Sequence, residues 1–249
     1  MTDLKQRILP RVQKPARYTG GEYNEIKKNL EDVRVRVAFC FPDTYEIGMS
    51  NLGMRILYGV MNNMDGVWCE RVFAPWGDME EEMRAENLPL WALESQDNVK
   101  DFDMIAFTIG YEMAYSNILN MLDLAGVPLH SKDRDGLHNI VFAGGVCAFN
   151  PEPLADFIDA FMVGDGEEQI LELNRVIMAG RQAGMSRLEI LKALCKVQGV
   201  YVPALYDVTY NEDGTIASMK PNCPEAPEKV LKAIITDLDE TYYPTEIPV

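Results

Sequence analysis

Residues 33–53 read VRVRVAFCFPDTYEIGMSNLG, and they contain the first unit of the fold. The run Val33–Pro42 is rich in β-branched and aromatic residues, which predicts a buried β-strand. The next residues, Phe41–Gly53, place a carboxylate, an aromatic ring, two glycines and a serine on one predicted loop. Apolar residues at helical spacing then run from Asn51 to Met64. A buried strand, a polar loop and an amphipathic helix in this order are typical of α/β proteins.

The same order recurs along the chain. Further strands are predicted at Val67–Pro75 and Phe102–Gly110. Asn139–Val146 and Asp159–Glu168 each read as a strand that runs into a glycine turn. Helices are predicted at Asp78–Glu86, Tyr111–Gly126 and Glu167–Gly180. The segment Pro89–Ser95 fits either a short strand or a connection. Continuously apolar strands that alternate with helices indicate a parallel sheet with helices on both faces. We therefore expect a doubly wound, mainly parallel, Rossmann-like or flavodoxin-like sheet.

Three parts are expected. Residues 1–32 are polar and form an N-terminal arm, and residues 33–185 form the sheet domain. Residues 186–249 form an appendage: a helix over Ser186–Gly199, a β-hairpin over Val200–Pro221, and a proline-punctuated linker. The hairpin turn is predicted at residues 211–214, NEDG, because asparagine, aspartate and glycine favour tight turns.

Charge and composition limit the function. The net charge of −16 disfavours direct nucleic-acid binding by this chain, because acidic proteins repel phosphate backbones. No apolar run is long enough for a membrane span and the N-terminus has no apolar signal core, so we expect a cytoplasmic protein without membrane contact. Five cysteines stand far apart with no CxxC pair, so no disulfide framework and no metal site is predicted. Cys40 and Cys147 are expected in the core, and His130 and His138 on the surface at the sheet edge opposite the glycine loops.

Four loops are expected at the carboxyl ends of the strands, where doubly wound sheets bind ligands. They are PDTYEIGMSN, TIGYE, AGGVCAFNPEP and GDGEE. Glycine allows a backbone to approach a ligand closely, although each loop taken alone fits a simple tight turn. Four glycine-containing loops at one edge favour a large flat ligand or a partner surface. The chain has no GxGxxG after its first strand, no GxxxxGK[ST] and no GxSxG, and no catalytic residue is predicted.

The order of these loops resembles a known family. Asp43-x-Tyr45-x-x-Gly48 is similar to the DxHxxG motif that follows the first strand of cobalamin-binding domains. Thr108 and Gly144-Gly145 match the later turns of those domains, and GGVCAFNPEPLADFIDAFMVGDGEE resembles their radical SAM branch. Residues 33–249 thus resemble the front part of the cobalamin-domain radical SAM family of unassigned function. The signature CxxxCxxC is absent from these residues, so we expect an N-terminal fragment, inactive alone, whose partner is a downstream barrel of the same polypeptide.

The resemblance implies a cofactor and a set of binding residues. The full-length enzyme would use a 4Fe-4S cluster and S-adenosylmethionine outside this chain, with cobalamin presented near that site. Tyr45 replaces the axial histidine, and since tyrosine is neutral below about pH 10, cobalamin would be held without a protein histidine on cobalt. The resemblance and the loop positions together give these candidate cofactor-binding residues: Asp43, Tyr45, Gly48, Ser50, Thr108, Gly110, Gly144, Gly145, Gly164, Gly166 and Glu167.

Two alternatives stay open. The domain could be a scaffold that has lost cobalamin and holds a substrate or a partner protein. It could also be a flavodoxin-like module that binds flavin or a phosphorylated ligand at the same loops, although the bulky stretch TYEIGMSNLG is unlike a phosphate-cradling loop.

Overall fold

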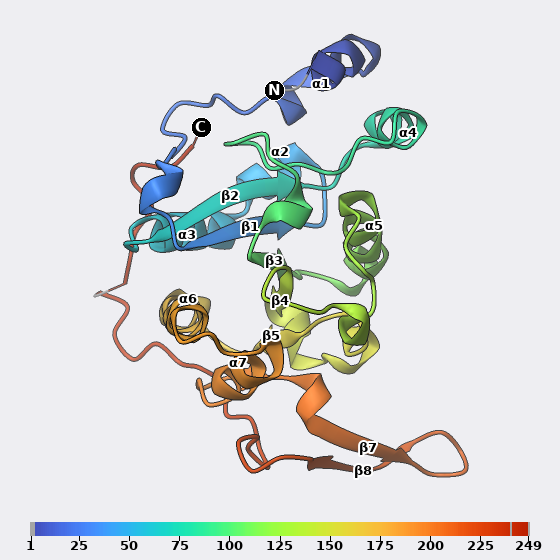
Figure 1. The fold of residues 1–249 in the computed structure, drawn as a ribbon, viewed down its shortest axis with the longest axis vertical. Coiled ribbons are helices and arrows are strands. Elements are labelled where there is room, and N and C mark those ends of the chain that lie inside the picture. Colours follow the sequence, from blue (N-terminus) through green and yellow to red (C-terminus); the bar gives the residue numbers. More distant parts are fainter. Residues whose placement is uncertain (1–2, 240, 249) are drawn as a thin grey trace.

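The computed structural model describes residues 3–239 and 241–248, and it contains a six-stranded sheet in the order β2-β1-β3-β4-β5-β6 (Figure 1). Strands β1 to β5 are parallel, and β6 runs antiparallel to β5. The order 2-1-3-4-5 is that of flavodoxin-like sheets, with its switch point between β1 and β3. The strands are β1 Val35–Phe41, β2 Val67–Phe73, β3 Met104–Thr108, β4 Ile140–Gly144, β5 Ala160–Met162 and β6 Val200–Tyr201.

Helices cover both faces of this sheet, as predicted. One face packs against α3 (Leu52–Asn62), α6 (Gly166–Gln182) and α7 (Arg187–Leu194). The opposite face packs against α4 (Gly77–Ala85) and α5 (Tyr115–Ala125), on the other side of the strands in Figure 1. The strands are almost entirely buried, which explains their continuous apolar sequences.

Local signals set the helix ends. The Asn51 side chain accepts a hydrogen bond from the Met54 backbone N–H at the start of α3. Ser186 and Glu189 form a reciprocal capping box at the start of α7. Gly126 ends α5 in the left-handed conformation, with φ of 70°.

Two sequence-based expectations are corrected. The stretch expected to be one loop after β1 contains a short helix, α2 (Tyr45–Ser50), because Gly48 and the residues around it pack down on the sheet edge. The predicted hairpin Val200–Pro221 is shorter than expected: Val200 and Tyr201 are buried and join the main sheet as β6. Pro203 opens a 3₁₀ turn next, and the hairpin proper consists of β7 (Tyr206–Tyr210) and β8 (Ile216–Pro221). Pro89–Ser95 is a connection, with one isolated bridge between Trp91 and Asn98.

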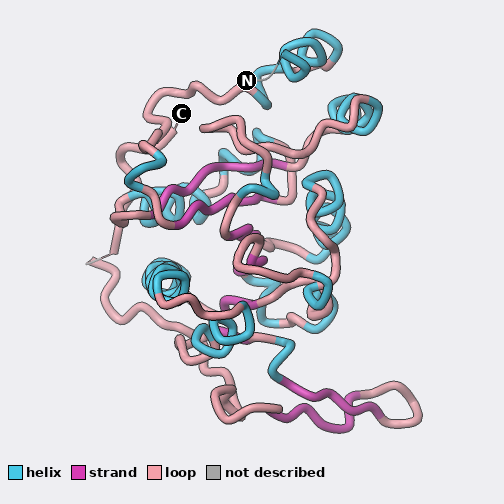
Figure 2. The backbone as a smooth tube through the Cα atoms, viewed as in Figure 1, coloured by secondary structure: helices cyan, strands magenta, loops and turns pink. Residues whose placement is uncertain are grey.

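Both ends of the chain wrap around the sheet domain. The N-terminal arm starts with α1 (Asp3–Ile8) and buries Ile8, Val12 and Tyr18 in the core. After β8 the chain is almost all loop in Figure 2, and it returns past α6 and α3. Tyr242 packs on Gly59 of α3, where any side chain would collide with its ring, and Ile247 is buried. The boundaries after Asp32 and Met185 remain predictions. Within the described ranges, no helix has the length and apolar character needed to span a bilayer.

Candidate functional site

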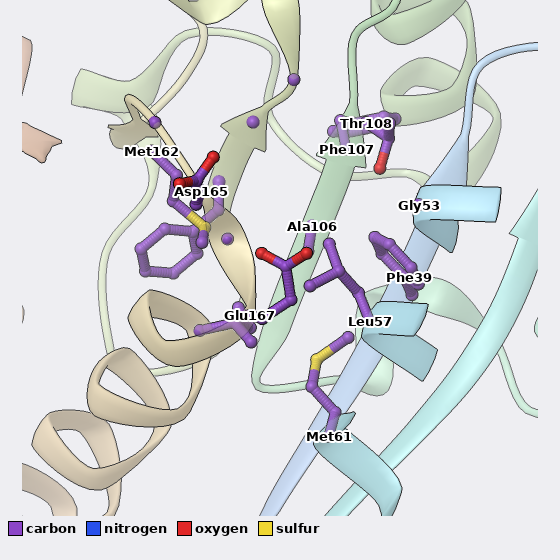
Figure 3. Close-up of a pocket in the computed structure, with 16 residues that line it drawn as sticks. Phe39, Gly53, Leu57, Met61, Ala106, Phe107, Thr108, Met162, Asp165 and Glu167 are labelled. Atoms are coloured by element: carbon purple, nitrogen blue, oxygen red, sulfur yellow. The ribbon is translucent and has the colours of Figure 1, made fainter. Parts of the chain in front are cut away.

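A cavity of about 250 Å³ lies at the carboxyl ends of β1, β3, β4 and β5, between α3 and α6 (Figure 3). It includes the β1–β3 switch point, where doubly wound sheets bind their ligands. Its walls are mainly apolar and are formed by Phe39, Leu57, Met61, Phe142, Met162 and Ile170. The predicted residues that follow β3, β4 and β5 line it: Thr108, Gly144, Gly145, Gly164, Gly166 and Glu167.

Two of these glycines have local packing roles. Gly145 has φ of 98°, and a Cβ there would lie 2.6 Å from the Ile109 carbonyl oxygen. Gly164 has φ of 112°, and a Cβ there would collide with the backbone of Ala233. Gly164 and Ala233 form a parallel bridge, so this glycine lets the C-terminal segment pass beside the cavity. Gly166 is different: its Cβ position faces Leu57 at ordinary contact distance, 3.5 Å, and has no unusual φ.

The polar groups of the cavity are acidic or neutral. The side chain of Glu167 points between Leu57 and Ala106 in Figure 3. Asp165 also lines the cavity, but its carboxylate accepts a hydrogen bond from the Ile235 N–H at 2.8 Å. The lining residues include no lysine, arginine or histidine. The site therefore suits an uncharged, mostly apolar group better than an isolated phosphate.

The predicted residues of the loop after β1 do not line this cavity. Asp43 accepts a hydrogen bond from the Tyr111 hydroxyl at 2.6 Å, which joins the loops after β1 and β3. Gly48 is buried so closely beneath the Phe73 ring that a side chain would overlap it, and Ser50 donates to the Ile47 carbonyl within α2. Gly110, after β3, is exposed and outside the cavity lining.

Tyr45, at the position of the expected histidine, is engaged elsewhere. Its hydroxyl donates a hydrogen bond to Glu22 of the N-terminal arm at 2.9 Å. Its ring packs edge-on against Phe73, with centroids 5.3 Å apart. Burial and the neighbouring Glu22 carboxylate raise the pKa of Tyr45 to about 12, so the hydroxyl stays protonated at neutral pH. In this conformation Tyr45 offers no metal ligand at the cavity.

The Glu22 contact belongs to a buried charged cluster that sequence reasoning missed. Arg71 on β2 contacts Glu94 (Nε–Oε1, 2.6 Å), Glu22 (Nη2–Oε2, 3.0 Å) and Glu25 (Nη2–Oε2, 3.7 Å). Arg71 also lies over the Tyr58 ring and donates to the Met49 sulfur at 3.2 Å. The signal was present in VWCERVF, where two charged residues interrupt an otherwise apolar strand. This cluster attaches the arm to the edge strand.

Burial also shifts the titration of the cluster. Removal from water raises the pKa of Glu94 to about 7, although Arg71 opposes the shift. Burial alone would lower the pKa of Arg71, but Glu94 and Glu22 raise it above its usual value. Arg71 therefore remains a cation, surrounded by more carboxylates than it can neutralise.

Metal-ligating side chains are not gathered on the part of the chain that the structure describes, where no group of three or more His, Cys, Asp or Glu could hold an ion. His130 packs on Phe157 and His138 lies 3.2 Å from Asp103, both at the amino-terminal edge of the sheet, as predicted. Cys40 and Cys147 are buried, which confirms that expectation. These residues do not fit an iron–sulfur cluster, and no histidine lies where cobalt would meet the carboxyl edge.

Comparison with known proteins agrees with the resemblance of the loops. The family model described as "Radical SAM proteins, N-terminal" matches residues 53–203, which is more than half of the chain and includes the cavity loops after β3, β4 and β5. "Uncharacterized protein MJ0966" of Methanocaldococcus jannaschii is 29% identical over 134 residues, which are 53% of this chain and 24% of that protein. The chain thus spans about a quarter of the relative's length. From the match over residues 53–203, the chain belongs to the family of N-terminal regions of radical SAM proteins.

Proposed function

We propose that this chain is the cobalamin-binding module of a radical SAM enzyme and that it holds the cofactor without a protein ligand on cobalt. The observation that carries the proposal is the cavity between α3 and α6, which is lined by the glycine loops after β4 and β5 and by Thr108 after β3. In the whole protein, a further domain would supply the 4Fe-4S cluster and S-adenosylmethionine, and cobalamin would supply an alkyl-carrying cobalt centre.

The size of the cavity limits what it can accept. Sites for whole drug-sized ligands measure about 300–1,000 Å³, and this cavity measures about 250 Å³. It can take one flat aromatic group, such as the base of the cofactor's nucleotide tail, but not a corrin macrocycle. The corrin would then lie outside, over the loops at the carboxyl edge. The apolar walls favour a ring system inserted between α3 and α6.

The positions of Tyr45 and the two histidines support the proposal that no protein side chain coordinates cobalt. Tyr45 is hydrogen-bonded to Glu22, and both histidines lie at the opposite edge of the sheet. The residues that line the cavity would hold the base of the cofactor's nucleotide tail, and no side chain of this edge would serve as a cobalt ligand.

Exposed apolar side chains around the same edge indicate that a further group or domain covers this edge. Large apolar residues on the loops after β3 and β4 face solvent: Met113, Val146 and Phe149. Exposed apolar groups gathered at one edge commonly mark a binding surface. We assign this surface to the corrin and, beyond it, to the catalytic domain of the same polypeptide. The match to an N-terminal region, and an alignment that covers only 24% of the relative, support that occupant.

One observation favours a second candidate. Tyr45 and Met49 turn into the Arg71 cluster, so the loop after β1 is filled by its own side chains. A cobalamin-free scaffold that presents its carboxyl edge to the catalytic domain would need no open loop there. The flavin or phosphorylated-ligand alternative is weaker, since the cavity lining has two carboxylates and no basic side chain.

Titration with hydroxocobalamin tests the proposal. The protein is incubated with the cofactor, free corrinoid is removed, and the visible spectrum is recorded. We expect retained corrinoid with a base-off spectrum. Gly166→Leu, which directs a side chain toward Leu57 without backbone strain, should weaken binding roughly tenfold or more, because overfilling a packed space costs about 1–3 kcal/mol.

Gly77→Leu is the matched control. Gly77 is the first residue of α4, as Gly166 is of α6, and no atom lies within 4 Å of its Cβ position. This variant should bind as the wild type does. Absence of retained corrinoid in the wild type would reject cobalamin binding in favour of the scaffold, and equal binding by Gly166→Leu and wild type would reject the cavity as the site.

A further inference from the structure

The cavity contains hydrogen-bond acceptors without partners. Within residues 3–239 and 241–248, the Glu167 carboxylate and the Thr108 hydroxyl make no hydrogen bond or ion pair with another residue. Both line the cavity, Glu167 from the start of α6 and Thr108 from the end of β3. Figure 3 shows the Glu167 carboxylate directed into the space among apolar side chains rather than outward.

A role in starting α6 does not explain this orientation. Negative charge in the first turn stabilises a helix, and Glu168 provides that charge from an exposed position. Glu167 would favour the helix equally well with its carboxylate in solvent. Asp165, the other carboxylate of the lining, is already bonded to the Ile235 N–H. Glu167 is therefore the acidic group of the cavity that is available to a ligand.

A ligand that fills the cavity must replace the water around this carboxylate. An ionised carboxylate can only accept hydrogen bonds. If the incoming group has no N–H or O–H to offer, the carboxylate loses its water without compensation, and binding is weakened. A group that is flat and apolar but carries a donor at its rim matches both the walls and Glu167.

We infer that the cavity selects cobamides whose nucleotide base carries a hydrogen-bond donor, such as adenine with its amino group, over cobalamin, whose dimethylbenzimidazole base carries methyl groups in place of a donor. Glu167 is the residue that determines this preference, and Thr108 can provide a second hydrogen bond from the opposite wall. The inference rests on the proposed insertion of the base between α3 and α6. It adds the chemical class of the base.

Equilibrium dialysis with two purified cobamides tests it. Adeninylcobamide and cobalamin, both in the aquo form, are titrated separately against the wild type and three variants. The wild type should bind adeninylcobamide about tenfold to a hundredfold more tightly, the range expected for a hydrogen bond to a charged group. Glu167→Gln should reduce this ratio, and Glu167→Leu should abolish or invert it. Glu168→Gln removes the same charge from the same helical turn and should leave the ratio unchanged.

The outcomes separate this inference from the proposal on which it rests. If both cobamides bind equally to the wild type, or if Glu168→Gln changes the ratio as much as Glu167→Gln does, the inference is wrong while the cobalamin-type site stands. If neither cobamide binds, both are wrong. Thermal unfolding of each variant shows whether a change in the ratio accompanies a loss of folding.

Discussion

The loop after β1 and the loops after β3, β4 and β5 all contain motifs that resemble one family, yet their side chains have different roles in the structure. The later loops bring Thr108, Gly144 and Gly166 to the edge of an open apolar cavity. The first loop turns its Tyr45 and Met49 side chains away into a buried charged cluster with the N-terminal arm. Tyr45 stands where the DxHxxG motif that this loop resembles has its histidine, and in this structure its side chain anchors the N-terminal arm. The two regions should therefore respond oppositely to mutation, the first in stability and the second in ligand binding.

The largest effect is expected from Arg71→Met, which breaks the anchor. Arg71 is buried, and its removal leaves Glu22 and Glu94 without their cation, whereas Glu25 keeps its ion pair with Lys27. Loss of one partner from a buried charged cluster costs about 3–5 kcal/mol. Urea unfolding should show that loss in the free energy of unfolding, and limited proteolysis should show earlier cleavage in the arm.

Arg84→Met is the control for this variant. Arg84 pairs with Glu80 and Asp123 on the exposed surface, where ion pairs contribute about 0–1 kcal/mol. Equal losses in the two variants would mean that the Arg71 cluster does not hold the arm.

A smaller effect is expected from pH. The pKa of Glu94 is raised to about 7 from its usual 4.5, so the folded state binds a proton that the unfolded state has already lost between these values. The contribution of Glu94 to the free energy of unfolding is therefore complete below about pH 4.5 and is lost as pH rises through 7. Between about pH 5 and about pH 8, the wild type should lose on the order of 2 kcal/mol of unfolding free energy relative to Glu94→Gln. Denaturant unfolding of both proteins at the two pH values measures this difference. Parallel pH profiles would show that Glu94 titrates normally.

The smallest effect is expected from Tyr45→His. The side chain at this position faces Glu22 and Phe73 and not the cavity, so the spectrum of bound hydroxocobalamin should stay that of the wild type. Loss of the hydroxyl contact to Glu22 should lower stability by only about 1 kcal/mol. A spectrum typical of imidazole on cobalt would mean that the loop after β1 does reach the cofactor, and the contrast between the two regions would fail.

Sequence patterns predicted the strands and the later loops, but not the contacts made by the loop after β1. The continuous apolar runs of β1, β3 and β4 predicted buried parallel strands, and the rule that such strands end at one edge correctly placed Thr108 beside Gly144. The helix α2 was missed because Gly48 and Ser50 are weak helix formers, and contact with Phe73 stabilises the turn instead. The Arg71–Glu22 contact joins positions 49 residues apart, and no local pattern encodes such a pairing. Gly164 lines the cavity as predicted, but no sequence pattern showed that its missing side chain also lets the backbone of Ala233 pass beside it.

One titration tests the central claim most directly: the dissociation constant of hydroxocobalamin for Gly166→Leu and for Tyr45→Phe, each compared with the wild type. If the cofactor enters between α3 and α6, Gly166→Leu binds it roughly tenfold or more weakly, and Tyr45→Phe binds it within about twofold of the wild type. If Tyr45→Phe is the variant that loses binding while Gly166→Leu keeps it, the cofactor lies on the loop after β1 and does not enter between α3 and α6.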